Sequence, residues 1–254
     1  MKKRYDGILI ASDWDGTLNV HGVINERDIR AIRDFQEGGG LFTICSGRSL
    51  EFMREFFDII CPNTYAISLN GAVIKHLETS EVLYENVLDK RVSEMIDIVC
   101  VKEMLFNKIY VFIKGKDHAS TYTPEEYKEN RDFIISCEIY KVVLVAENVE
   151  NTLKAKTLLE NGGYDGYIFV RSWEVSLEIL KEENGKGYAL NRVKEKEGCH
   201  TTIAVGDYEN DIQMLQMADI GYAVGNASQA TKSAADIITV PAEEGAIATI
   251  IESL

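Results

Sequence analysis

The segment ILIASDWDGTL, residues 8–18, decides the fold prediction for this chain. Its apolar first half, Ile8 to Ser12, is typical of a short strand that is buried on both faces. Asp13 and Asp15 follow where this strand should end, and side chains two positions apart in an extended segment point the same way. Two such carboxylates repel each other unless a cation or a proton lies between them. The alternative interpretation is an ordinary Asp-Gly turn, because Gly16 allows the chain to turn sharply.

The composition limits the possible partners. The chain has 254 residues and a formal charge of −14, which argues against a protein that binds nucleic acid and against binding to an anionic membrane surface. The length allows one large domain or two smaller ones. We expect a monomer or a weak homo-oligomer. The N-terminal segment is too short and too charged for a signal peptide, and no apolar run is long enough to span a bilayer. The five cysteines are scattered, without a CxxC pair, which favours reduced thiols and a cytoplasmic location.

Strands and helices alternate at both ends of the chain. The pattern predicts strands at 8–12, 41–45 and 65–69, with helices around 29–35 and 49–57 between them. The same order returns near the C-terminus, with helices at 186–196 and 211–217, strands at 201–205, 220–224 and 237–240, and a closing helix from 243. This rhythm is typical of parallel strands with right-handed crossovers. The predicted fold class is therefore α/β, with a doubly wound, parallel, Rossmann-like sheet.

The section between these two ends has a different texture. Residues 81–181 are rich in Glu, Lys and Tyr, and their strands are shorter and more alternating. We expect helices at 92–99, 124–133 and 149–160, and strands at 109–113, 142–145, 167–170 and 175–180. About 100 residues are enough for a small α/β domain. The sequence therefore predicts one domain from 1–80 and 182–254, with a second domain, 81–181, inserted into it.

Polar residues follow several strands of the predicted parallel sheet, and open parallel sheets bind ligands at that edge. Taken singly, each has an ordinary interpretation, such as a turn, a helix cap or a solvated lysine. Together, four carboxylates, a hydroxyl and a lysine at one sheet edge match the groups needed for phosphoryl transfer through an aspartate. The six residues are Asp13, Asp15, Asp207, Asp211, Ser46 and Lys186; Gly47, Asn70 and Asn210 follow the same strands.

The chain resembles the haloacid dehalogenase superfamily, in its Cof-type sugar-phosphatase-like branch. Its motifs occur here in order as DWDGTL at 13–18, TICSGR at 43–48 around Ser46, Lys186, and GDYEND at 206–211; the accessory signatures are NGA at 70–72 and AVGNA at 223–227. The inserted section falls between the second and third motifs, where that branch carries a large α/β cap. The resemblance implies a catalytic core and a substrate-specificity cap. Trp14 is bulkier than is usual between the paired aspartates, and we expect its side chain to point away from them.

The resemblance implies a Mg²⁺-dependent phosphatase acting on a small phosphomonoester, such as a sugar phosphate or a related phosphometabolite. Asp13 would be the nucleophile that becomes an aspartyl phosphate, and Asp15 the general acid and then the general base. Lys186 would neutralise Asp13 and the charge that develops in transfer. The metal ligands would be Asp13, the main-chain carbonyl of Asp15, and Asp207, with Asp211 either a ligand or a neighbour of one.

The resemblance also implies substrate-binding residues. Ser46 and the Gly47 amide would bind phosphoryl oxygens, and Asn70 and Asn210 would help to bind and orient the reacting groups. The cap would close over the site and read the leaving group.

Two alternatives remain open at this level. A phosphomutase would return the phosphoryl group to a sugar rather than to water. A non-catalytic sensor of phosphorylated ligands would use the same fold, although Asp15 and Lys186 are both present here. A receiver-type signalling domain is disfavoured because it lacks such a large insertion.

Overall fold

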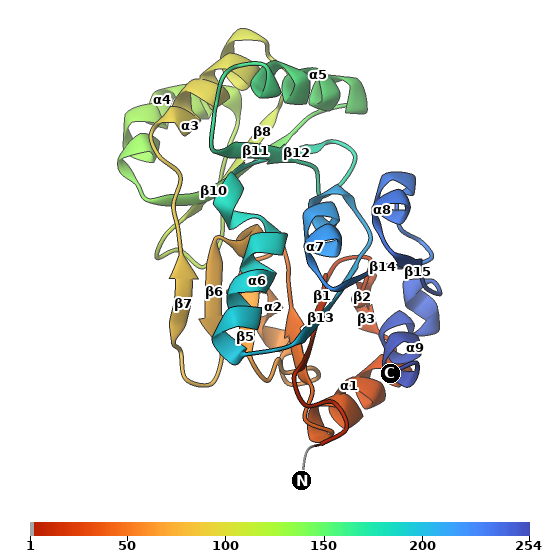
Figure 1. Ribbon diagram of the computed structural model, residues 1–254. Coiled ribbons are helices and arrows are strands. Elements are labelled where there is room, and N and C mark those ends of the chain that lie inside the picture. The colour runs from red at the N-terminus through yellow and green to blue at the C-terminus, as the bar shows by residue number, and fades with distance from the viewer. Residues whose placement is uncertain (1–2) are drawn as a thin grey trace. The chain divides into compact units, whose positions relative to one another are not determined.

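The structure is a computed structural model that describes residues 3–254. The chain forms two compact units, drawn in Figure 1. Unit 1 comprises Met1–Tyr84 and Gly185–Leu254, and unit 2 comprises Glu85–Asn184. The functional division predicted at 81–181 stays a prediction. Within residues 3–254, no helix is both long enough and apolar enough to cross a bilayer.

Unit 1 is built on a parallel sheet, which confirms the predicted α/β fold class. Its strands lie in the order β15 (Ile237–Ile238), β14 (Ile220–Ala223), β13 (Thr201–Gly206), β1 (Ile8–Ser12) and β4 (Leu41–Ile44), and every pairing is parallel. β5 (Tyr65–Ser68) continues beside the end of β4 through a parallel bridge between Cys45 and Ile67. The carboxyl ends of these strands therefore meet along one edge, as the sequence predicted.

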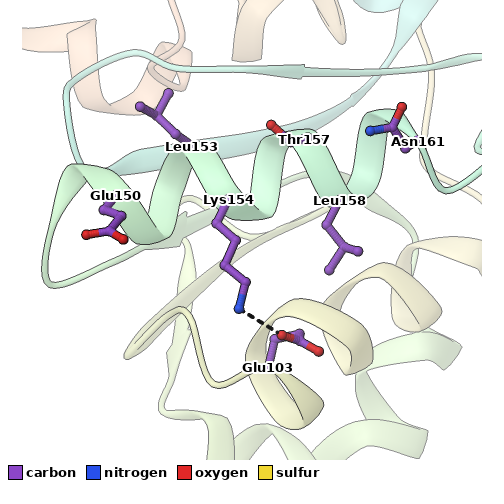
Figure 2. Close-up of a pocket in the computed structure, with 7 residues that line it drawn as sticks. All are labelled: Glu103, Glu150, Leu153, Lys154, Thr157, Leu158 and Asn161. Atoms are coloured by element: carbon purple, nitrogen blue, oxygen red, sulfur yellow. Dashed lines mark hydrogen bonds and ion pairs between the residues drawn. The ribbon is translucent and has the colours of Figure 1, made fainter.

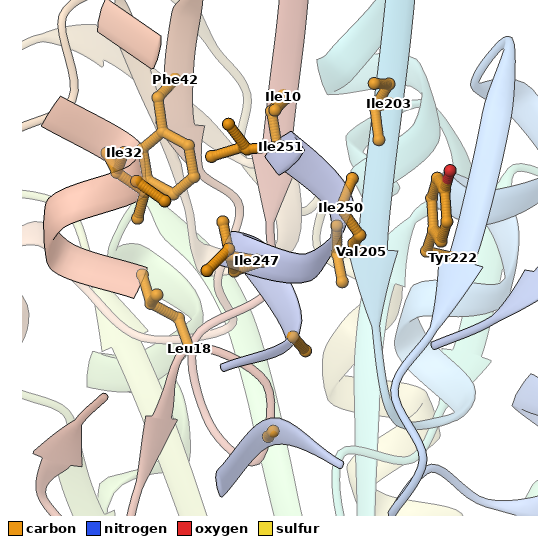
Figure 3. Close-up of a cluster of buried hydrophobic side chains, with 14 of the residues drawn as sticks. Ile10, Leu18, Ile32, Phe42, Ile203, Val205, Tyr222, Ile247, Ile250 and Ile251 are labelled. Carbon is orange, nitrogen blue, oxygen red and sulfur yellow. The ribbon is translucent and has the colours of Figure 1, made fainter. Parts of the chain in front are cut away.

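Helices cover both faces of this sheet. Ile10 of β1 packs into one apolar cluster with α1 (Glu26–Glu37) and α9 (Ala246–Glu252), which lie side by side in Figure 1. Figure 3 shows Ile32 of α1 and Ile247, Ile250 and Ile251 of α9 in this cluster. Its neighbours Leu9 and Ala11 point to the other face, into a cluster with α6 (Lys186–Glu197) and α7 (Ile212–Met217). Burial on both faces explains why β1 reads as a continuous apolar run. The remaining helical segments of unit 1 are α2 (Leu50–Met53), η1 (Arg54–Phe56), η2 (Leu69–Gly71), η5 (Glu209–Asp211), α8 (Gln229–Ala234) and η6 (Ala242–Glu244).

Two hairpins of unit 1 were not predicted from the sequence. β5 pairs antiparallel with β6 (Val73–His76), and the same small sheet includes β7 (Val82–Glu85). A second hairpin joins β2 (Asn19–Val20) and β3 (Val23–Ile24). β5 is buried and was predicted as a strand at 65–69, but β2, β3, β6 and β7 are short and largely half-exposed. They therefore carry little of the apolar periodicity on which sequence prediction relies.

Unit 2 is an antiparallel sheet with helices. Its strands run in the order β11 (Tyr167–Val170), β12 (Ser176–Lys181), β10 (Ile139–Val145), β8 (Lys108–Ile113) and β9 (Ser120–Tyr122). Alternating residues of β8 and β10, such as Val111 and Val142, enter a buried cluster of their own. The helical segments are α3 (Arg91–Ile96), which continues into a π-helical stretch, η3 (Asp97–Lys102), followed by α4 (Pro124–Ser136), α5 (Val149–Glu160) and η4 (Glu182–Asn184). The unit thus has a core of its own.

Candidate active site

Three of the predicted carboxylates meet at the carboxyl edge of the unit 1 sheet. Asp13 directly follows β1, Asp207 directly follows the neighbouring β13, and Asp211 ends the short helical turn η5. Each offers one carboxylate oxygen, and these oxygens lie within 4.8 Å of one another. Asp13 and Asp211 are buried. The parallel register of β1 and β13 places the two strand ends side by side, and the cluster follows from that register.

Lys186 lies among these carboxylates rather than in solvent. Its side chain is fully buried, and its ammonium donates to Asp13 Oδ1 at 2.5 Å and to Asp211 Oδ1 at 2.6 Å. Lys186 is the first residue of α6, and Gly187 lets this end of the helix approach α7 closely, because a Cβ there would lie 2.7 Å from the Gln213 carbonyl oxygen. The solvated-lysine interpretation is therefore wrong.

The electrostatics of the cluster show an excess of negative charge. Burial and the nearby Asp211 raise the pKa of Asp13 well above its ordinary value, although Lys186 opposes the change. Burial, again with Asp211, raises the pKa of Asp207 to about 7. Burial alone would lower the pKa of Lys186, but Asp13 and Asp211 outweigh it and hold that pKa well above its usual value. When all three carboxylates are ionised, the one ammonium leaves two negative charges unbalanced. A hard divalent cation that prefers oxygen ligands fits this donor set.

The oxygens of Asp211 are already used within the protein. Oδ1 accepts from Lys186, and Oδ2 accepts from the backbone N–H groups of Asp207 at 3.0 Å and Tyr208 at 3.2 Å. These bonds hold the loop that carries Asp207. Asp211 therefore positions both Lys186 and Asp207.

Asp15 lies outside this cluster of carboxylates. Its side chain is 55% exposed, and its two oxygens accept from the Arg48 guanidinium, Oδ2 from Nε at 2.8 Å and Oδ1 from Nη2 at 3.0 Å. The sequence contained the signal for this partner, because Arg48 belongs to the SGR motif, but no role was predicted for it.

Ser46, Asn70 and Asn210 form a second part of the site, joined largely through the backbone. Ser46 Oγ accepts from the Arg48 N–H at 3.0 Å, and the Ser46 carbonyl accepts from the Asn70 N–H at 2.9 Å. The Asn210 side chain donates to Asn70 Oδ1 at 3.3 Å. Leu69 and Asn70 both have positive φ, 52° and 55°, a conformation that is rare outside glycine and concentrates at functional sites. Gly47, also predicted, lies between Ser46 and Arg48 and is half-buried.

The turn after Asp15 depends on two residues. Gly16 has a φ of 81°, and a Cβ at this position would collide with the Asp207 carboxylate. The Asn226 side chain donates to the Gly16 carbonyl at 2.8 Å and accepts from the Ala242 N–H at 2.9 Å. The sequence pointed to Asn226 only through the accessory signature at 223–227 and gave it no role. Its role in the structure is to hold the first motif in place.

Trp14 lies between Asp13 and Asp15, and its side chain was expected to point away from them. Trp14 is fully buried, and its ring lies against Phe56 with ring centres 4.9 Å apart. Its indole N–H has no hydrogen-bond partner among the residues that the structure describes. Trp14 is thus part of the apolar cluster that also contains Ile10 of β1.

Two pockets differ in their relation to these residues. One, of about 390 Å³, is lined by Asp15 and Arg48 together with Trp14, Phe52 and Phe56, among others. A larger one, of about 790 Å³, lies along α5 in unit 2. Lys154 on this helix donates to Glu103 at 3.0 Å, and Figure 2 shows this pair beside the pocket. None of the residues lining this second pocket was predicted as a site residue, and only the first pocket borders the site.

Comparisons with known proteins agree on one family. A family model described as haloacid dehalogenase-like hydrolase matches residues 10–251. The 5-amino-6-(5-phospho-D-ribitylamino)uracil phosphatase YcsE of Bacillus subtilis is 28% identical, over 96% of this chain and 94% of its own length. The pyridoxal phosphate phosphatase YbhA of Escherichia coli is 27% identical, over 96% and 97% of the two chains. The solved structure of BT4131, a HAD subclass IIB sugar phosphatase, has a TM-score of 0.78 at 22% identity, covers 96% of this chain and 98% of that one, and supports the fold alone.

Proposed function

The chain belongs to the haloacid dehalogenase-like hydrolase family, in its Cof-type branch, and is a phosphoric monoester hydrolase; from this premise we propose that it is a Mg²⁺-dependent phosphatase that acts through an aspartyl phosphate on Asp13. The observation that carries the proposal is the buried Lys186 ammonium between Asp13 and Asp211, with Asp207 in the same cluster. This arrangement holds the Asp13 oxygen in place, and Lys186 can neutralise the charge that develops on transfer.

The residues at the sheet edge suit Mg²⁺. In the proposal, the Asp13 and Asp207 carboxylates and the Asp15 main-chain carbonyl hold the ion. Asp211, whose oxygens already accept three hydrogen bonds, acts on it through its neighbours. When bound, the ion supplies the positive charge that lets a dianionic phosphate approach three carboxylates.

Asp13 and Asp15 divide the chemistry between them. An Asp13 oxygen bonds to phosphorus as the bond from phosphorus to the leaving oxygen breaks, and a proton on Asp15 passes to that oxygen. Asp15 then takes a proton from water, the water oxygen bonds to phosphorus, and the bond from Asp13 to phosphorus breaks, releasing phosphate. Lys186 balances the charge on Asp13 throughout.

The phosphoryl oxygens are bound by the second part of the site. We assign this to the Ser46 hydroxyl and the Gly47 amide, while Asn210, bonded to Asn70, orients the groups around them. The strained turn at Leu69 and Asn70 supports this assignment, because its backbone is bonded to Ser46 and Arg48.

The substrate in this proposal is a small phosphomonoester, a sugar phosphate or a related phosphometabolite. The relatives act on phosphorylated metabolites of this size, by their names. We propose that unit 2, residues Glu85–Asn184, is the substrate-specificity domain. A cytoplasmic location also belongs to the proposal; all five cysteines are free thiols.

The test is hydrolysis of p-nitrophenyl phosphate with and without Mg²⁺, by wild type and by Asp13→Asn. Asp34→Asn, at an exposed aspartate on α1, is the matched control. We expect Mg²⁺-dependent release of phosphate by wild type and the control, and only background release by Asp13→Asn. Equal release by Asp13→Asn and wild type would contradict the mechanism. A panel of sugar phosphates and other phosphometabolites then addresses the substrate.

A further inference from the structure

The Asp15–Arg48 pair has the geometry of a positioning device. Both Asp15 oxygens accept from one guanidinium, at 2.8 and 3.0 Å. A bidentate fork of this kind fixes both the place and the plane of a carboxylate, which a lysine ammonium cannot do. The Asp15 side chain is 55% exposed, so it would otherwise be free to change rotamer.

Arg48 is itself held to the site on several sides. Its backbone N–H donates to Ser46 Oγ at 3.0 Å, and its carbonyl accepts from the Leu69 N–H at 3.0 Å. Its guanidinium lies over the Phe52 ring, 4.2 Å from the ring centre. The arginine therefore ties the loop of Asp15 to the segment that carries Ser46.

We propose that Arg48 is a positioning residue, which acts by holding the Asp15 carboxyl in the orientation needed for proton transfer. The inference rests on the proposed function, in which Asp15 gives a proton to the leaving oxygen and later takes one from water. Such transfer requires the carboxyl oxygen within hydrogen-bond reach of the reacting atom. An error of about 1 Å in a reacting group can cost on the order of 100-fold in rate.

The pocket beside the pair makes the idea testable by chemical rescue. It measures about 390 Å³ and is lined by Asp15, Arg48 and the aromatic residues Trp14, Phe52 and Phe56. Because Arg48 and Phe52 are both exposed, a small guanidinium compound from solution can reach the space that a truncated Arg48 would leave.

The first experiment is a double-mutant cycle on p-nitrophenyl phosphate, with Arg48→Met, Asp15→Asn and the double variant. Arg54→Met, at an exposed arginine of the same segment, is the matched control. We expect Arg48→Met to lower kcat by about 10- to 100-fold with little change in KM. In the Asp15→Asn background, Arg48→Met should not lower kcat further. If Arg48 acts only through Asp15, the effects of the two substitutions are not additive. An equal loss in both backgrounds, a loss expressed in KM, or no loss would overturn the proposal.

The second experiment separates positioning from a role in folding. Methylguanidinium should restore part of the activity of Arg48→Ala and none of that of Arg48→Ala/Asp15→Asn, whereas a purely structural defect would not respond. Arg48→Lys should remain impaired, because its ammonium offers a point charge and not a fork. Absence of rescue in Arg48→Ala would overturn the proposal. If wild type showed no Mg²⁺-dependent turnover, the proposed function itself would have failed, which is a distinguishable result.

Discussion

Replacing Asp28 with asparagine tests a buried carboxylate that lies outside the proposed active site. Asp28 lies on α1 and is fully buried, and its Oδ1 accepts from the Ala248 N–H in the first turn of α9 at 2.7 Å. Its Oδ2 has no hydrogen-bond partner within residues 3–254. Burial raises the pKa of Asp28 to about 6, against the opposing effect of the Ala248 hydrogen bond. The contact between α1 and α9 thus contains a group that titrates near neutral pH.

The magnitude follows from the difference between the folded and unfolded pKa values. The pKa of Asp28 rises from 3.8 to about 6 on folding, which corresponds to about 3 kcal/mol of linkage free energy. Because the folded pKa is the higher one, this stability is fully present below pH 4 and is lost as the pH rises through 6. Between pH 8 and pH 5, wild type should gain about 1.4 kcal/mol from Asp28. The asparagine of the variant does not titrate and gains nothing over this range.

The assay is urea unfolding of wild type and Asp28→Asn at several values of pH between 5 and 8. The quantity of interest is the difference between their free energies of unfolding at each pH, because other titrating groups contribute equally to both proteins and cancel. The new amide can change the free energy of unfolding by a constant amount, and such a constant does not alter how the difference varies with pH. We expect this difference to shift by about 1.4 kcal/mol in favour of wild type from pH 8 to pH 5. A flat difference, or a shift of opposite sign, would refute the reasoning.

Three further predictions concern the site. Lys186→Met should reduce p-nitrophenyl phosphate turnover by at least about 100-fold, measured against Lys194→Met, a partly exposed lysine of the same helix; a comparable loss in both would contradict the role of Lys186. Mg²⁺ should raise the melting temperature, and its apparent affinity should fall as the pH drops below 7, because protons compete at Asp207, whose pKa is about 7; titration at pH 6 and pH 8 by calorimetry checks the sign. Gly16→Ala should weaken Mg²⁺ binding and lower the melting temperature, since its Cβ would displace the Asp207 carboxylate and strain a positive φ; unchanged binding would show that the loop adapts.

The residues that sequence analysis could predict are those placed by topology. Asp13 and Asp207 follow neighbouring parallel strands. Their proximity can be predicted from the alternation of strands and helices, together with the rule that ligands bind at one edge of such a sheet. Lys186 was also placed at this edge, but its role needed the family resemblance, because a lysine flanked by glycines has no pattern that distinguishes burial from solvation.

The residues that sequence analysis missed are placed by side chains that meet from distant segments. Arg48 reaches Asp15 across 33 positions, and Asn226 reaches Gly16 across 210. Neither contact leaves a periodic signal in the chain, because each depends on the conformation of two loops at once. β2, β3 and β6 were missed for a related reason, since they have two, two and four residues and too few apolar positions to show a period of two. β5, the partner of β6, was predicted as a strand at 65–69.

The sequence identifies the residues of the site, but it does not determine their charge state. The motifs indicate four carboxylates and a lysine, but they carry no information on which of the carboxylates is buried. The structure separates them by burial. Asp15 remains exposed and paired with Arg48, while Asp207 is held at a pKa of about 7 beside Asp211. A pKa near 7 at a proposed ligand means that protons compete with the cation for this carboxylate near neutral pH. We expect proton release on Mg²⁺ binding near pH 7, and the release should be smaller in Asp207→Asn, in which Asp13, whose pKa is also raised, remains.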